Sequence, residues 1–125
     1  MGSVMFSVVV LGVFLLVQIL AGNRLGNAGK PYKAAGMAGH IILSLFIVAG
    51  LSVSVYKLHG ITAGKLYSML SLHVTGALLL INIITGIILT VVKKDNPALV
   101  LTHKVTSVLM AVSVIACIIF LAVKI

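Results

Sequence analysis

Hydrophobic residues are gathered into four long runs along the chain, separated by short polar stretches. The runs extend from Val4 to Ala21, from Met37 to Tyr56, from Leu66 to Val92 and from Ala98 to Val123. Each is close to or above the roughly 20 residues that a helix needs to cross about 30 Å of hydrocarbon. A segment in lipid must satisfy its own backbone hydrogen bonds, so all four are predicted to be helices. Because short connections make neighbours antiparallel, we predict an all-α integral membrane protein, an up-down four-helix bundle forming a single transmembrane domain over residues 1–125.

Composition and charge support a chain that is solvated by lipid. Hydrophobic residues make up 62% of the sequence and charged residues 8%, which leaves too little polar surface for a soluble domain. The net charge of +8 indicates topology rather than nucleic-acid binding. Six basic residues flank one predicted membrane face, namely Arg24, Lys30, Lys33, Lys93, Lys94 and Lys104, and three flank the other, namely Lys57, Lys65 and Lys124. We therefore expect the first face to be cytoplasmic and both termini to be outside, in the plasma membrane of a prokaryote.

The segments around the runs suggest structure rather than chemistry. The first run is interpreted as a true helix, because its positive charges follow it, whereas those of a signal peptide precede the apolar region. Residues 22–36 are rich in glycine and predict a flexible basic connector. Arg24 and Pro31 stand where a phosphate-binding loop needs glycine and Ser or Thr. Asp95-Asn96-Pro97 predicts a helix start, and the single Cys117 predicts a buried thiol.

Four histidines are the most informative polar residues. His40, His73 and His103 lie within the runs, and His59 follows the second run. Ionisable side chains at membrane depth are costly and need a partner. The runs contain no acidic residue and one cysteine, so the iron of a haem is the partner that best suits a neutral imidazole. The alternative is that each histidine hydrogen-bonds across the bundle and that the small residues near it serve helix packing.

His40 and His103 satisfy the simplest requirement of a bis-histidine haem site. Counting about 1.5 Å per residue from the basic boundary places both roughly 6 Å below the interface, on the second and fourth helices. Their helical stripes follow the period of a core-facing surface and are unusually small or polar. The stripes contain Gly36, Leu43, Ile47, Gly50 and Ser54 on the second helix, and Thr106, Met110, Ser113 and Cys117 on the fourth. We therefore predict that these two histidines bind one haem b.

A second haem is predicted nearer the opposite face. His73 on the third helix comes out about 28 Å from the basic boundary, and His59 about 34 Å. A bend after Tyr56, permitted by nearby glycines, would bring these two histidines together. Met5 on the first helix is an alternative thioether ligand, although a methionine in an apolar run usually serves packing.

Part of the chain resembles the cytochrome b561 family and related four-helix b-type cytochromes. The resemblance rests on Leu66-Tyr67-Ser68, on Leu72-His73 followed by Gly76, and on the later helix that contains His103; it covers residues 36–120 loosely. It implies histidines on successive helices that hold two haems near opposite membrane faces. By this resemblance His40, His73 and His103 are ligands, with His40 and His103 sharing one haem. The first helix lacks the histidine that the family pattern would pair with His73.

These residues together predict electron transfer. Two axial histidines close both open positions of the iron, which favours electron transfer over oxygen activation. We expect a protein without substrate chemistry of its own that moves electrons within or across the bilayer. Its partner would be a quinone or a redox protein, and the chain would form a homo-oligomer or part of a larger complex. Lys104 would neutralise a haem propionate, and Gln18 would bond a propionate or an imidazole or, equally, join two helices.

Other classes of function are less consistent with the sequence. A non-redox accessory subunit needs no histidines at matched depth. A small proton-coupled transporter normally needs a carboxylate in the bundle, and the runs contain none. Copper bound by His and Met is a further metal alternative.

Overall fold

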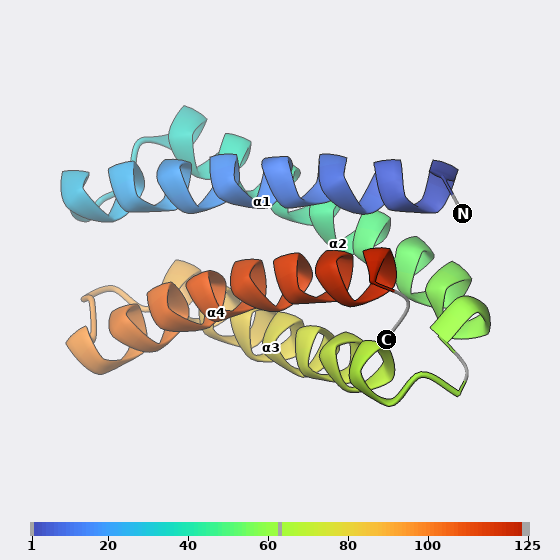
Figure 1. The fold of residues 1–125 in the computed structure, drawn as a ribbon. Coiled ribbons are helices and arrows are strands. Elements are labelled where there is room, and N and C mark those ends of the chain that lie inside the picture. The colour runs from blue at the N-terminus through green and yellow to red at the C-terminus, as the bar shows by residue number, and fades with distance from the viewer. Residues whose placement is uncertain (1, 63, 124–125) are drawn as a thin grey trace.

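Four helices account for nearly all of the chain, as the hydrophobic runs predict. The computed structural model describes residues 2–62 and 64–123, and within them the helices are α1 (Gly2–Ala28), α2 (Ala34–Thr62), α3 (Leu66–Val91) and α4 (Pro97–Ala122) (Figure 1). The described residues contain no strand. Each helix contains a span that is long and apolar enough to cross a membrane. The protein is therefore an all-α integral membrane four-helix bundle, whose surroundings are the lipid bilayer.

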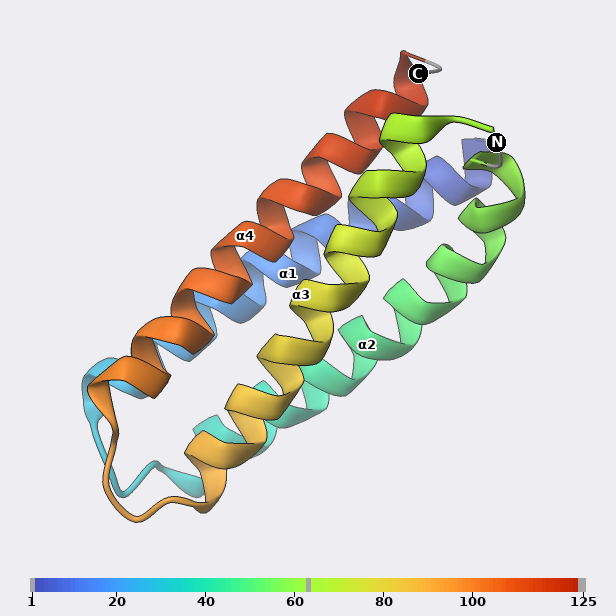
Figure 2. The same cartoon turned by 90° about the horizontal axis from the view of Figure 1, so that it is seen from below.

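The bundle consists of two antiparallel hairpins. Helices α1 and α2 pack against each other, and α3 and α4 share the most extensive interface of the bundle. The hairpins meet mainly through α1 and α4, while α2 and α3 make a smaller contact. The ring of neighbours is therefore α1, α2, α3 and α4 in chain order, which places α2 and α4 on a diagonal (Figures 1 and 2).

Both short loops, residues 29–33 and 92–96, lie at the same end of the bundle (Figure 2). The start of α1, the end of α2, the start of α3 and the end of α4 lie at the other end. Since α2 and α4 both begin at the loop end, residues equally far from their first turns lie at similar depth.

Two helices are longer than the sequence predicts. Helix α1 continues to Ala28, so Gly22 and Gly26 are helical and the predicted flexible connector shrinks to the few residues around Gly29, whose φ is 73°. Helix α2 continues to Thr62, so the predicted bend after Tyr56 is wrong. Glycine costs a helix only about 1 kcal/mol. Each helix therefore continues through its polar segment and ends only near a proline or a glycine in the left-handed conformation.

Apolar side chains from all four helices form the core. The buried ones are Val8, Leu15, Ile47, Leu51, Leu58, Leu72, Met110, Ala111, Val114 and Cys117. The stripes predicted on α2 and α4 face inward except at Gly36, which is exposed, and the Leu11 side chain of α1 packs against Gly50. Most other large apolar residues are exposed and form the lipid-facing surface. The single thiol, Cys117, is buried as predicted.

Hydroxyl groups join α3 to α4 inside the bundle. The side-chain oxygens of Thr75 and Ser113 lie 2.6 Å apart, and the Ser113 hydroxyl also donates to the main-chain carbonyl of Ser71 at 3.1 Å. Interhelical hydrogen bonds of this kind contribute roughly 0.6 kcal/mol each in membrane proteins. They help to explain why the second hairpin is the more closely packed of the two.

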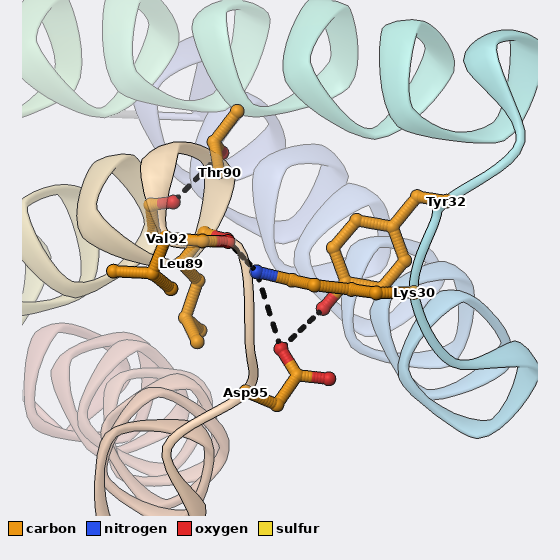
Figure 3. Close-up of polar contacts among 7 residues, drawn as sticks. Lys30, Tyr32, Leu89, Thr90, Val92 and Asp95 are labelled. Carbon is orange, nitrogen blue, oxygen red and sulfur yellow. Dashed lines mark hydrogen bonds and ion pairs between the residues drawn. The ribbon is translucent and has the colours of Figure 1, made fainter.

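A polar cluster joins the two loops at the basic end (Figure 3). The Lys30 ammonium donates to the main-chain carbonyls of Leu89, at 2.7 Å, and Val92, and it forms an ion pair with Asp95 at 3.3 Å. The Tyr32 hydroxyl donates to the same carboxylate at 3.1 Å. Partial burial, and then the bond to Asp95, raise the pKa of Tyr32, which keeps this donor protonated at neutral pH. Because Lys30 satisfies carbonyls that the end of α3 leaves unpaired, the cluster fastens the first hairpin to the second.

Candidate functional site

The two hairpins repeat one pattern of polar and small residues. Gln18 and Gly22 on α1 correspond to Asn82 and Gly86 on α3, in each case 64 residues later. His40 on α2 corresponds to His103 on α4, 63 residues later. The match extends along the first helix of each hairpin, where Met5, Ser7, Gly12, Leu15, Leu16, Ile19 and Leu25 recur as Met69, Ser71, Gly76, Leu79, Leu80, Ile83 and Leu89. The chain therefore contains an internal repeat of one helical hairpin, in which His40 and His103 occupy equivalent positions.

In the first hairpin, an amide from α1 holds the backbone of α2 at the histidine. The Gln18 side-chain nitrogen donates to the main-chain carbonyl of His40 at 2.9 Å and to the Ser44 hydroxyl, and it lies 3.4 Å from Nε2 of the His40 ring. Ser44 in turn donates to the His40 carbonyl at 2.7 Å. Gln18 therefore joins two helices and also contacts the imidazole, so both of its predicted protein contacts are present.

The second hairpin repeats these contacts with its own residues. The Asn82 side-chain nitrogen donates to the main-chain carbonyl of His103 at 3.0 Å, to the Thr106 hydroxyl at 3.0 Å and to the Ser107 hydroxyl at 2.6 Å. Ser107 donates to the His103 carbonyl at 2.8 Å, as Ser44 does to the carbonyl of His40. Each histidine is therefore fixed along its helix by an amide of the neighbouring helix.

Each imidazole also lies against a glycine of the partner helix in its hairpin. A Cβ on Gly22 would stand 2.9 Å from Cε1 of His40, and a Cβ on Gly86 would stand 3.0 Å from Cε1 of His103. Any side chain larger than hydrogen would therefore displace the ring. The two glycines form notches in α1 and α3 that accommodate the imidazoles inside the hairpins.

The two imidazoles occupy equivalent positions on diagonal helices. His40 is six residues from the start of α2, and His103 is six residues from the start of α4. At about 1.5 Å per residue, both lie about 9 Å along their helices from the loop end. Both side chains are partly buried. The structure therefore places both members of the predicted pair at matched depth, each against the other helix of its own hairpin.

The ring nitrogens of the two histidines have different partners. Nδ1 of His103 lies 2.9 Å from the hydroxyl oxygen of Thr85. Nδ1 of His40 is buried and has no hydrogen-bond partner, and the side-chain oxygen of Gln18 is also buried and unpaired. Leaving a buried polar atom unpaired costs roughly 1–3 kcal/mol. The first hairpin thus contains polar atoms that the described part of the chain does not satisfy.

Lys104 introduces a positive charge beside this pair. Its ammonium nitrogen would stand 3.9 Å from a Cβ on Gly26, so the side chain crosses from α4 to α1 over that glycine. Gly26 lies one helical turn from Gly22, where the His40 ring is seated. A cation is therefore held close to the imidazoles, on the side of the loops. The corresponding residue of the first hairpin is Ile41, so this feature is not repeated.

His59 and His73 are placed differently. Both side chains are exposed, and Nδ1 of His73 lies 2.7 Å from the main-chain carbonyl of Met69, one turn earlier on the same helix. The two rings make no hydrogen bond with each other in the part of the chain that the structure describes. Their pairing around a second haem stays a prediction, and its expected means, the bend after Tyr56, is absent because α2 is helical there.

The described residues contain no group of three or more His, Cys, Asp or Glu side chains that could hold a metal ion. A haem site needs only two protein ligands, so this observation does not bear on the His40 and His103 pair. Comparison of the chain with models of protein families, with curated proteins and with solved structures gave no match. Arguments about function therefore rest on the site itself.

Asn82, Thr85 and the two glycine notches could not be predicted from the depth of single residues. The available signal was the internal repeat, because Gln18 and Asn82 are the two amides that precede a glycine by four residues in the first helix of a hairpin. Comparison of the two halves of the sequence would have found them.

Proposed function

We propose that the protein is a membrane b-type cytochrome that holds a haem between His40 and His103 and transfers electrons within or across the bilayer. The observation that carries this proposal is the pair of imidazoles at equal depth on diagonal helices, each beside a glycine and each on a residue whose main-chain carbonyl accepts from an amide of the neighbouring helix. Two imidazoles from different helices are the ligand set of a low-spin, electron-transferring haem. The resemblance of residues 36–120 to the cytochrome b561 family points in the same direction.

The fit of this site to a haem can be tested on the polar atoms themselves. A structural pair of histidines would be expected to have both of its rings satisfied by the protein, since unpaired buried polar groups are rare. Nδ1 of His40 and the oxygen of Gln18 are instead unpaired. Gly22 and Gly86 have no side chain, so each leaves space on its helix for the imidazole ring that it faces. The donor chemistry of the pair therefore fits the group, and Nδ1 is the nitrogen of His40 that has no protein partner.

When bound, haem supplies an iron that gains and loses one electron. His40 and His103 would hold the iron, and ligation by both side chains would favour electron transfer over oxygen binding. Lys104 would neutralise a propionate, because its ammonium is held over Gly26 beside the pair. Gln18 would orient His40 rather than bind a propionate, since its nitrogen already contacts His40 and Ser44.

Two observations favour this function over its alternatives. A non-redox accessory subunit would use the histidines only for packing, which gives no reason for an unpaired nitrogen in the first hairpin. A proton-coupled transporter would need a carboxylate within the bundle, whereas the single acidic residue, Asp95, lies in the loop between α3 and α4. The electron partner is proposed to be a quinone or a redox protein, with the chain acting alone, as a homo-oligomer or in a larger complex.

An absorption spectrum of the purified protein tests the proposal. We expect protein expressed with a haem supply to contain at least one haem b per chain by the pyridine haemochrome assay. The dithionite-reduced spectrum should be low-spin and unchanged by carbon monoxide, because both axial positions are closed. Two haems per chain would support the second site at His73, with His59 or Met5 as its partner. Protein that contains no haem and does not bind added haemin would contradict the proposed function.

The orientation in the membrane is proposed from the basic residues. The loop end carries six of them and would face the cytoplasm of a prokaryotic cell, with both termini outside. In a Cys117→Ser background, we expect Ala35→Cys and Ala98→Cys, near the two loops, to resist an impermeant maleimide added to intact cells. Ser3→Cys, at the opposite end of α1, should be labelled and serves as the control. The reverse labelling pattern would invert the assignment.

A further inference from the structure

The internal repeat is broken beside the two histidines. Thr85 precedes Gly86 in α3, and the equivalent residue that precedes Gly22 in α1 is Ala21. The hydroxyl of Thr85 is the partner of Nδ1 of His103. Ala21 has a methyl group and no hydroxyl at the equivalent position, which explains why Nδ1 of His40 has no partner. The two imidazoles therefore occupy equivalent places with different support.

The contacts of Thr85 determine which nitrogen of His103 carries the proton. Its hydroxyl oxygen lies 2.9 Å from the main-chain carbonyl of Ile81 and 3.1 Å from that of Asn82, and both carbonyls can only accept. A hydroxyl has one hydrogen to donate. If that hydrogen points to a carbonyl of α3, the oxygen can only accept from the ring, so Nδ1 of His103 must be protonated. Donation to Nδ1 instead would leave the hydroxyl oxygen facing two carbonyl oxygens without a hydrogen between them.

We propose that Thr85 is a positioning residue that holds His103 as the Nδ1-protonated tautomer with the lone pair of Nε2 free for a metal, and that Ala21 leaves His40 as the weakly supported member of the pair. This inference rests on the proposed haem function for its consequence. A histidine that donates its other ring N–H is fixed in orientation and is a more basic metal ligand. His103 is then the firm ligand of the iron, and His40 is the ligand that moves or exchanges more readily.

The tautomer can be measured without haem. Correlation spectra of ¹⁵N-labelled apoprotein in detergent should show His103 as the Nδ1-protonated form. Thr85→Val, which keeps the shape of the side chain, should turn His103 into a mixture, and Thr85→Ser should restore the single form. Thr90→Ala is the matched control, because the Thr90 hydroxyl donates to the Gly86 carbonyl on the exposed side of the same helix. An unchanged His103 tautomer in Thr85→Val would overturn the inference.

The consequence for the haem is measured separately. Thr85→Val should lower haem affinity by about 10-fold to 100-fold, the usual effect of losing a partner of a ligating histidine. It should also shift the reduction potential to a more positive value, since a less basic imidazole stabilises ferric iron less. Ala21→Thr, which supplies the missing hydroxyl to His40, should shift both quantities in the opposite direction. If haem binds and neither variant differs from the parent protein, the positioning role is wrong.

Failure of the inference and failure of the proposed function are therefore distinguishable. A tautomer of His103 that depends on Thr85, in a protein that binds no haem, would support the positioning role and reject the cytochrome. Haem binding with a His103 tautomer that Thr85→Val leaves unchanged would support the cytochrome and reject the positioning role.

Discussion

Replacement of His40 or His103 with alanine is expected to remove the haem. Each change deletes one of two axial ligands, so haem affinity should fall by more than about 100-fold, beyond the usual effect of altering a residue that only supports a ligand. Haem per chain, measured by the pyridine haemochrome assay after purification, should drop to near zero in both variants. Added free imidazole should partly restore the low-spin spectrum, because it can occupy the position of the deleted ring.

Two controls separate ligation from folding in this experiment. His59→Ala and His73→Ala remove exposed rings and should leave the haem between His40 and His103 in place. Circular dichroism should show the same helical content in all four variants, since each hairpin keeps its amide contacts to the main chain. Undiminished haem in both His40→Ala and His103→Ala would show that the pair does not bind it.

Alanine at Gly22 or Gly86 is expected to disturb the site almost as strongly. The added Cβ would stand about 3 Å from the ring of His40 or His103, closer than such atoms pack, so the imidazole must move away. Inserting a methyl group into a packed interior costs roughly 1–3 kcal/mol, which outweighs the gain of up to about 1 kcal/mol from replacing a helical glycine. We expect lower thermal stability of the bundle and loss of the low-spin haem spectrum.

Gly39 provides the matched control for this effect. It lies in α2 next to His40, and a Cβ at that position would meet nothing within 4 Å. Gly39→Ala should therefore keep the haem and raise the midpoint of thermal unfolding slightly, because alanine is the better helix former. A Gly22→Ala protein that behaves like Gly39→Ala would mean that the notch in α1 has no role in placing the imidazole.

Much of the architecture follows from local features of the sequence. Four apolar runs of spanning length leave helices as the only solution in lipid, and short connections at Lys30-Pro31 and Asp95-Asn96 make their neighbours antiparallel. Pro97 begins α4, and the Asn96 side chain accepts from the main-chain N–H of Ala98 at 3.0 Å, as the helix-start signature predicts. Helix ends were harder to predict, since glycine only weakens a helix and does not mark where it stops.

The sequence by itself determined the membrane helices, the core-facing stripes and the equal depth of His40 and His103, because each depends only on composition and on distance along one helix. The tertiary structure decided what surrounds each ring. Gly22 and Gln18 reach His40 from α1, and Thr85 reaches His103 from α3, across interfaces whose register no single helix encodes. Hydrogen bonds and notches between helices depend on which faces meet and at what height. Which faces meet, and at what height, is fixed only when the helices pack together. The resulting contacts make two equivalent histidines chemically different.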